Sequence, residues 1–169
     1  MKAILALLAC GLILFACAGL GGWGAARLRR RIEFLAGLTR GVDSLMRDID
    51  YLASPLPQAL DQAAGFAGAA SSLFAAAARL LRSGAGLSGS EAWLAALEET
   101  DCRECAPVAA SLGAGLGETD AAGQLQQLGA CRQRLTLAQT EAEGDYARFG
   151  KIWRSMGWCG GAALILLLL

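Results

Sequence analysis

The residues best suited to chemistry are two cysteines, Cys102 and Cys105, separated by Arg103 and Glu104. A C-x-x-C spacing can serve thiol and disulfide exchange, or it can supply half of a zinc site. A zinc site needs two further ligands, but only Cys131 is another cysteine between the apolar ends, and the chain has no histidine. The strand and helix alternation expected around a thioredoxin-like motif is also missing. We therefore predict structural thiols, with a membrane-tethered thiol redox or metal-binding protein as the alternative.

The absence of histidine also removes the commonest general base and the usual catalytic triad. Gly144 and the pair Gly150-Lys151 resemble a phosphate-binding loop only superficially. Five residues instead of four separate the glycines, and Ile152 stands where serine or threonine is required. The sequence therefore predicts a protein that is not an enzyme, with no catalytic residue, no cofactor and no metal site.

The composition is too apolar for an ordinary soluble domain, with 55% hydrophobic and 18% charged residues. Between residues 32 and 147, seven basic residues stand against fifteen acidic ones, an excess of eight negative charges that disfavours nucleic-acid binding. Apart from Lys2, the other basic residues gather beside the apolar ends, at 27–31 and 148–154. Positive clusters in these places are typical of the cytoplasmic side of a membrane.

Two apolar segments predict membrane spans at the ends of the chain, with membrane lipid as their partner. Residues 1–26 contain about 20 nearly uncharged residues, enough for a helix to cross a hydrocarbon core of about 30 Å. An export signal with a lipoprotein-like Cys17 is the alternative, but the heavier positive charge after the segment favours an uncleaved anchor. Residues 152–169 are shorter and span only if Arg154 extends toward the headgroups. Both termini are then expected outside.

The chain between these ends predicts helices and no sheet, because valine and threonine are scarce and no stretch alternates. Two heptad-like apolar stripes predict a long first helix and a long last helix that pack together. These stripes are Leu28, Ile32, Leu35, Leu38, Val42, Leu45, Ile49 and Leu52, and then Leu128, Cys131, Leu135, Ala138, Ala142, Phe149, Ile152 and Met156. The predicted fold class is all-α: an antiparallel helical bundle over residues 27–151, between an N-terminal and a short C-terminal transmembrane helix.

Local signals predict where the intervening helices begin and end. Pro55 and Pro57 form a corner at which the first long helix stops and a new helix starts, with Ser54 as its cap. Gly65 and Gly68 predict a break into two shorter helices. Farther on, Ser88-Gly89-Ser90-Glu91 has the spacing of a capping box, a short helix is expected after residue 107, and residues 119–120 are expected to cap the last helix.

Acidic residues around the corner predict an interaction site. The site comprises Asp43, Asp48, Asp50, Tyr51, Pro55, Pro57 and Asp61. A helix that continues the first span would place the corner about 36 Å from the membrane, beyond most of its surface potential. Acidic charge there would attract a partner with a basic surface. The alternative is that the acids only keep an alanine-rich bundle soluble.

Four segments, in order along nearly the whole chain, resemble the stage III sporulation protein AB family of endospore-forming bacteria. They are RRRIEFLAGLTRGVDSLMRDIDYLASPLPQAL, GLSGSEAWLAAL, LGETDAAGQLQQL and KIWRSMGWCGGAALILLLL. The residues that match recurrent family letters are Asp48, Tyr51, Pro55, Leu56, Pro57, Asp120, Gly123 and Gln124. Asp48 keeps the acidic character of its position, although glutamate is expected there. The chain departs from the family pattern at Gln58, where glutamate is also expected, and in the C-x-x-C motif.

The resemblance implies a membrane protein whose cytoplasmic bundle is similar to the platform protein of type II secretion and type IV pilus machines. It implies a non-enzymatic scaffold in the mother-cell membrane around the forespore, within the assembly that links the two cells. The implied partners are the sporulation ATPase of the same operon and other membrane subunits. A homo-oligomer is a further possibility that the resemblance leaves open.

Overall fold

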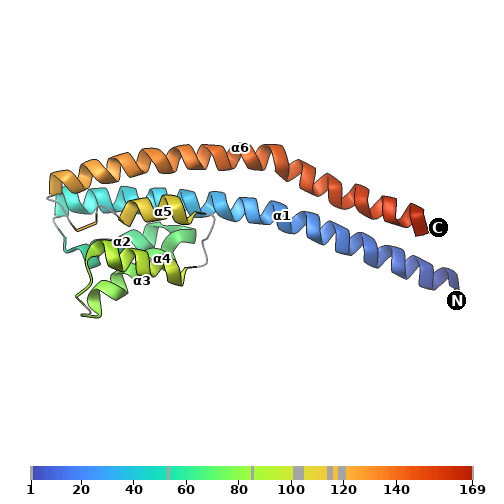
Figure 1. Ribbon diagram of the computed structural model, residues 1–169, viewed down its shortest axis with the longest axis horizontal. Helices are drawn as coiled ribbons and strands as arrows, with labels where there is room; N and C mark the ends of the chain where they lie inside the picture. The colour runs from blue at the N-terminus through green and yellow to red at the C-terminus, as the bar shows by residue number, and fades with distance from the viewer. Residues whose placement is uncertain are drawn as a thin grey trace. The chain divides into compact units, whose positions relative to one another are not determined.

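The computed structural model describes the chain as a set of helices. Its backbone is described at residues 2–52, 54–84, 86–100, 105–113, 116–117 and 121–168, and its side chains at 23–51, 54–84, 86–100, 105–113, 116–117 and 122–149. The elements are α1 (Lys2–Arg47), η1 (Asp48–Leu52), α2 (Leu56–Phe66), η2 (Gly68–Ala70), α3 (Ser71–Arg82), α4 (Gly89–Glu99), α5 (Ala106–Gly113) and α6 (Ala121–Leu168) (Figure 1). The described residues contain no strand, so the all-α prediction is confirmed.

The chain divides into two units. One is the helical domain, Arg31–Thr140, and the other is a terminal unit that combines Met1–Arg30 with Glu141–Leu169. The spans predicted at residues 1–26 and 152–169 lie outside the described side chains, apart from residues 23–26. Among the described residues, no helix has an apolar stretch long enough to cross a membrane. Both spans therefore stay predictions.

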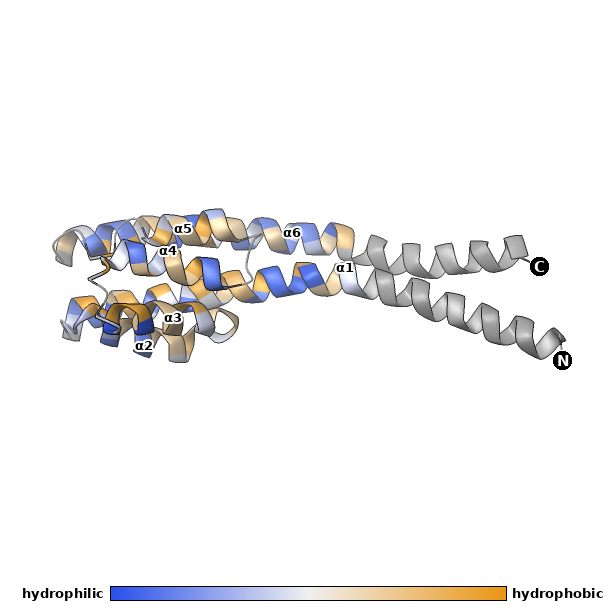
Figure 2. Ribbon diagram, turned by 60° about the horizontal axis from the view of Figure 1, so that its bottom comes forward, coloured by the Kyte–Doolittle hydropathy of each residue, from blue (hydrophilic) through white to orange (hydrophobic). Residues whose placement is uncertain are grey.

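The helical domain buries the apolar stripe predicted on α1. Its central members, Leu35, Leu38, Val42 and Leu45, are at most 1% exposed. Within this domain α6 runs back alongside α1 (Figures 1 and 2), and the short helices pack in succession, α2 against α3, α3 against α4 and α4 against α5. From α6, Leu128 and Leu135 are buried as well. The central parts of both predicted stripes are therefore buried. Phe149, which was predicted in the second stripe, is instead 47% exposed, and Ile152 and Met156 lie outside the described side chains.

The turn from α1 into α2 differs from the prediction in one respect. α1 continues into η1, a single π-helical turn, and the chain then reaches Pro55, which is the N-cap of α2 and has φ −55° and ψ 137°. The Pro55 carbonyl accepts hydrogen bonds from the backbone N–H groups of Gln58, at 2.8 Å, and Ala59, at 3.1 Å. The predicted Ser54 cap is therefore wrong. Pro55 itself has the extended ψ that is typical of an N-cap residue, so the first turn begins at Leu56, one residue later than predicted.

The predicted break after α2 is confirmed. α2 ends at Phe66, and the chain passes through η2, where Gly68 has a φ of 53° that favours glycine. Arg40 of α1 donates from Nε to the Phe66 carbonyl at 3.2 Å. This bond satisfies a carbonyl that the end of α2 leaves without a helical partner.

The predicted capping box at the start of α4 is also confirmed. The Ser88 side chain accepts from the Glu91 N–H at 3.2 Å, and the Ser88 N–H donates to Glu91 Oε2 at 2.8 Å. Two hydrogen bonds to the Glu91 carboxylate lower its pKa. The larger effect comes from the Ser88 backbone N–H and the smaller one from the Ser88 side chain. The predicted caps of α6 at residues 119–120 lie outside the described residues.

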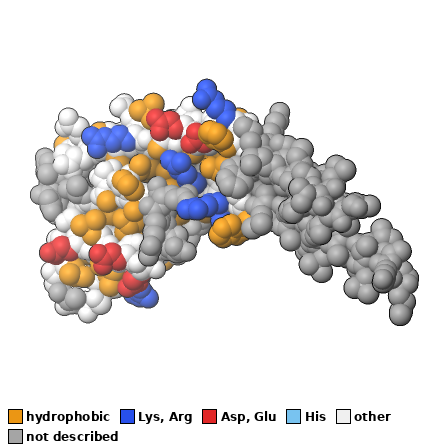
Figure 3. All heavy atoms as spheres, turned by 45° about the vertical axis from the view of Figure 1, so that its right-hand side comes forward, with side chains coloured by type: hydrophobic (Ala, Val, Ile, Leu, Met, Phe, Trp, Pro, Cys, Tyr) orange, Lys and Arg blue, Asp and Glu red, His pale blue; other side chains and the backbone are white. Residues whose placement is uncertain are grey.

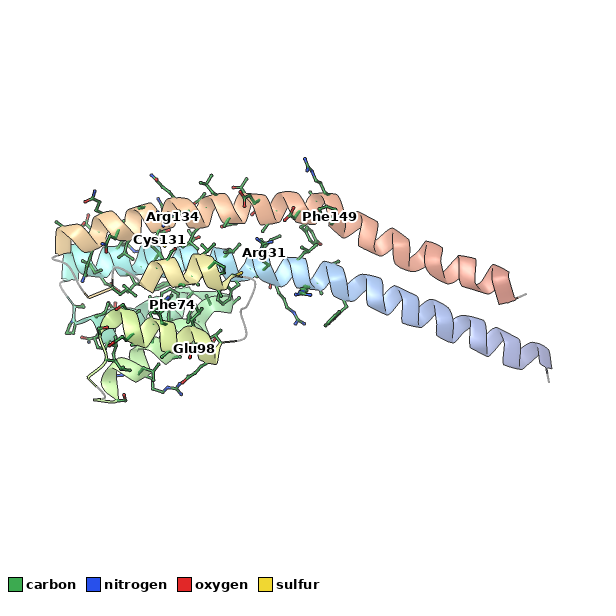
Figure 4. All side chains as sticks on the ribbon, in the orientation of Figure 1. Arg31, Phe74, Glu98, Cys131, Arg134 and Phe149 are labelled. Atoms are coloured by element: carbon green, nitrogen blue, oxygen red, sulfur yellow. The ribbon has the colours of Figure 1, made fainter. Side chains whose placement is uncertain are left out.

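An aromatic pair fills the space between α3, α4 and α5. Phe74 of α3 and Trp93 of α4 have no exposed surface, and their ring centroids lie 5.0 Å apart at an interplanar angle of 72°. The Trp93 indole donates from Nε1 to the Ala109 carbonyl of α5 at 2.8 Å. Figure 4 shows Phe74 directed into the domain interior. Trp93 therefore joins three helices through packing and a buried hydrogen bond.

Candidate functional site

The two described cysteines of the helical domain, Cys105 and Cys131, are buried and form no disulfide. Cys105, which precedes α5, is 3% exposed, and Cys131 of α6 is 5% exposed. Cys131 is labelled in Figure 4. Cys131 Sγ lies 3.8 Å from Ser111 Oγ, and burial raises the pKa of the Cys131 thiol. Cys102 lies outside the described residues, and no cluster of three or more potential metal ligands occurs among those that are described. These surroundings favour the structural role over thiol chemistry.

Thiol labelling should follow this burial. Burial keeps the reagent away from both thiols, and because the thiolate is the reactive form, the raised pKa of Cys131 slows its reaction further. We expect Cys105 and Cys131 to resist iodoacetamide at pH 8 in the native full-length protein, and to react fully in denaturant. Mass-spectrometric mapping of the adducts over time measures both rates. Rapid native labelling of Cys105 would contradict its packing and revive the thiol alternative.

The seven residues of the predicted interaction site lie in or beside the turn from α1 to α2. Asp50, Tyr51 and Pro55 are exposed, Asp43, Pro57 and Asp61 are half-buried, and Asp48 is buried. The structure therefore gathers the predicted residues in one region of the helical domain. The four acids nevertheless differ in burial, and their spacing along the chain did not predict these differences.

Two of these acids form ion pairs within the domain. Asp43 Oδ1 lies 2.6 Å from Arg132 Nε, which joins α1 to α6. Asp61 of α2 accepts two hydrogen bonds from the Arg82 guanidinium of α3, one of them at 3.0 Å. Half-exposed pairs of this kind add about 0–1 kcal/mol to stability. Their main consequence is local neutralisation, because each carboxylate already faces an arginine.

Asp48 ties the π-helical turn to α2. Its side chain is 6% exposed, and in the orientation that its neighbours favour, the Gln62 amide donates to both carboxylate oxygens, at 3.2 and 3.3 Å. A buried carboxylate needs such partners, because burial without hydrogen bonds is costly. Asp48 is therefore not one of the surface acids that were predicted around the corner. Its register indicates burial, since Asp48 follows Leu45 by three residues on the buried stripe.

An open groove lies between the end of α1 and the start of α6. Its volume is about 510 Å³. Its lining combines apolar side chains with charges of both signs and comprises Asp43, Met46, Arg47, Asp50, Tyr51, Leu125 and Arg132. Mixed charge is also visible on the face of the domain in Figure 3. Leu125 and Arg132 of α6 were not predicted, because nothing in their local sequence indicates that they adjoin the corner.

Tyr51 is the most prominent side chain of this groove. It is 82% exposed, and Asp50 beside it is exposed too. On the neighbouring surface the Arg47 guanidinium lies 5.9 Å from the centroid of the Phe66 ring, which is 58% exposed. The arrangement offers no nucleophile paired with a base, but it offers aromatic and charged groups for protein binding.

Comparisons with known proteins agree with the resemblance seen in the sequence. The model of the family described as stage III sporulation protein AB matches residues 6–169. A solved structure described as "Stage III sporulation protein AB (SpoIIIAB)" is similar, with a TM-score of 0.61 and 25% sequence identity, covering 69% of this chain and 96% of that chain. A search of curated proteins found no match. Because the family model extends over nearly the whole sequence, this chain belongs to the stage III sporulation protein AB family.

Proposed function

We propose that this protein is a non-enzymatic platform subunit of the sporulation assembly that links mother cell and forespore. Its apolar ends hold it in the mother-cell membrane around the forespore, with the helical domain in the cytoplasm. The charge pattern supports this orientation, since arginines cluster beside the first apolar segment and the domain itself is acidic. Family membership supports the sporulation role. The docked partner is the ATPase of the same operon, alongside other membrane subunits.

The observation that carries the docking proposal is the exposed pair Asp50 and Tyr51 on a turn that is itself fixed. Short π-helical segments are rare and are often found at functional sites. Here the Asp48 and Gln62 contact holds the turn against α2, so less conformational freedom is lost when a partner binds. Exposed tyrosine is a frequent energetic centre of interfaces, and Asp50 favours approach of a basic surface.

A double substitution tests this site. The variant Asp50→Asn with Tyr51→Ala should weaken ATPase binding about thirtyfold, the effect of losing one tyrosine hot spot of about 2 kcal/mol. Its Tm should not change, because Tyr51 is 82% exposed. Binding of the purified ATPase to immobilised full-length protein in mild detergent gives Kd at low and moderate salt.

Leu137→Ala on α6 is the matched control, because Leu137 is 66% exposed and lies outside the groove lining. It should bind as the unmodified protein does. Asp43 and Asp61 are unsuitable targets, since changing them also removes ion pairs with Arg132 and Arg82. Equal Kd values for the double variant and the Leu137 control would refute docking at this turn and leave family membership untouched.

A further inference from the structure

The terminal unit carries exposed arginines beside an exposed aromatic residue. Residues 27–31 include four arginines and no acid, and the side chains of Arg27, Arg29 and Arg30 are exposed. Trp23 is 67% exposed. Its spacing to Arg27 and Arg30 is four and seven residues, which places all three on one face of α1. We name Trp23, Arg27, Arg29 and Arg30 the arginine collar.

The last helix contributes similar side chains to the same unit. Arg148 of α6 is exposed, and Phe149 beside it is 47% exposed (Figure 4). Tryptophan and other aromatic rings prefer the headgroup level of a membrane, where an apolar body and a polar edge are both satisfied. On α1, Arg27 lies about one helical turn beyond Trp23, or about 5.4 Å along the axis. A Trp23 ring at the headgroup level would therefore place the Arg27 guanidinium near the lipid phosphates.

We infer that the arginine collar binds the headgroups of anionic phospholipids. The inference rests on the membrane placement in the proposed function and adds the lipid class. A guanidinium donates paired hydrogen bonds to phosphate oxygens, and it keeps its charge at every physiological pH. Arg27 and Arg29 also interact within the protein, and they keep exposed surface beside those contacts.

Charge separation along the chain supports an anionic surface as the occupant. The collar is basic, whereas residues 32–147 carry eight excess negative charges. An anionic bilayer therefore attracts the collar and repels the acidic stretch of residues 32–147. Each arginine near such a surface strengthens association about fivefold, and the effect decays within a Debye length.

The test compares two lipids at Trp23. Full-length protein with Trp153→Phe and Trp158→Phe retains Trp23 and Trp93, and Trp93 is fully buried in the helical domain. The vesicles contain phosphatidylcholine and phosphatidylglycerol, and in each sample only one of the two lipids carries brominated acyl chains. Bromine quenches tryptophan fluorescence, so the two samples show which lipid lies beside Trp23. We expect phosphatidylglycerol to be preferred, and the preference to fall about fivefold or more in Arg27→Gln/Arg30→Gln and in 1 M salt.

Arg134→Gln is the control, because Arg134 is an exposed arginine of the helical domain (Figure 4). It should retain the full preference. Equal quenching by both lipids, or an unchanged preference in the double variant, overturns the inference. An alkaline carbonate wash separates this result from the proposed function. A chain that stays in the vesicles without lipid preference overturns headgroup binding alone, whereas a chain that washes off overturns the membrane placement as well.

Discussion

Trp93→Ala should lower the free energy of unfolding of the helical domain by about 3–5 kcal/mol, the usual cost of truncating a buried tryptophan. Trp93 has no exposed surface, packs edge-on against Phe74 and donates to the Ala109 carbonyl at 2.8 Å. Alanine would leave a cavity between α3, α4 and α5 and remove that hydrogen bond. Most single domains are stable by only about 5–15 kcal/mol, so this loss would remove a large share of the total.

Urea titration of the full-length protein in mild detergent, followed by far-UV circular dichroism, measures this loss. Leu94→Ala is the matched control, because Leu94 is the next residue of α4 and is 47% exposed. Its cost should be about 1 kcal/mol or less, since roughly half of the side chain is already in water. Similar midpoints for the two variants would show that Trp93 does not anchor the domain.

Gly37→Ala should destabilise the domain by up to about 3 kcal/mol, although alanine is the better helix former. A Cβ at Gly37 would overlap the Ala67 carbonyl oxygen, and it would lie 3.0 Å from the backbone nitrogen of Ala70 and 3.2 Å from its Cβ. These are mostly backbone atoms, which cannot rotate away as a side chain can. α1 would have to move away from the junction of α2 and α3.

Gly129→Ala on α6 is the control with the opposite expected sign. A Cβ there would meet nothing within 4 Å, so the gain in helix propensity should raise stability by about 0.5–1 kcal/mol. The same urea titration compares both variants. If Gly37→Ala also raises the midpoint, the close approach of α1 to Ala67 and Ala70 is absent in solution.

The helices could be predicted from the sequence because their causes are local. Apolar periodicity predicted α1 and α6, and the spacing from Ser88 to Glu91 predicted the cap of α4. Gly65 and Gly68 predicted the interruption between α2 and α3, where the chain adopts a positive φ at Gly68. Each of these signals acts within one or two helical turns. Family membership was likewise predictable, since it rests on short segments in a constant order.

The properties of the candidate site depend on contacts between residues far apart in the chain. Acid spacing predicted an acidic surface at the corner, but packing buries Asp48 against α2 and pairs Asp43 with Arg132 of α6. The groove beside Tyr51 exists only because α6 returns to the end of α1. Helix packing angles and register determine which side chains remain exposed, and these follow from distant contacts such as that of Gly37 with Ala67. The sequence thus determined the helices and the family, whereas tertiary packing decided that Asp50 and Tyr51 are the exposed polar side chains of the predicted site.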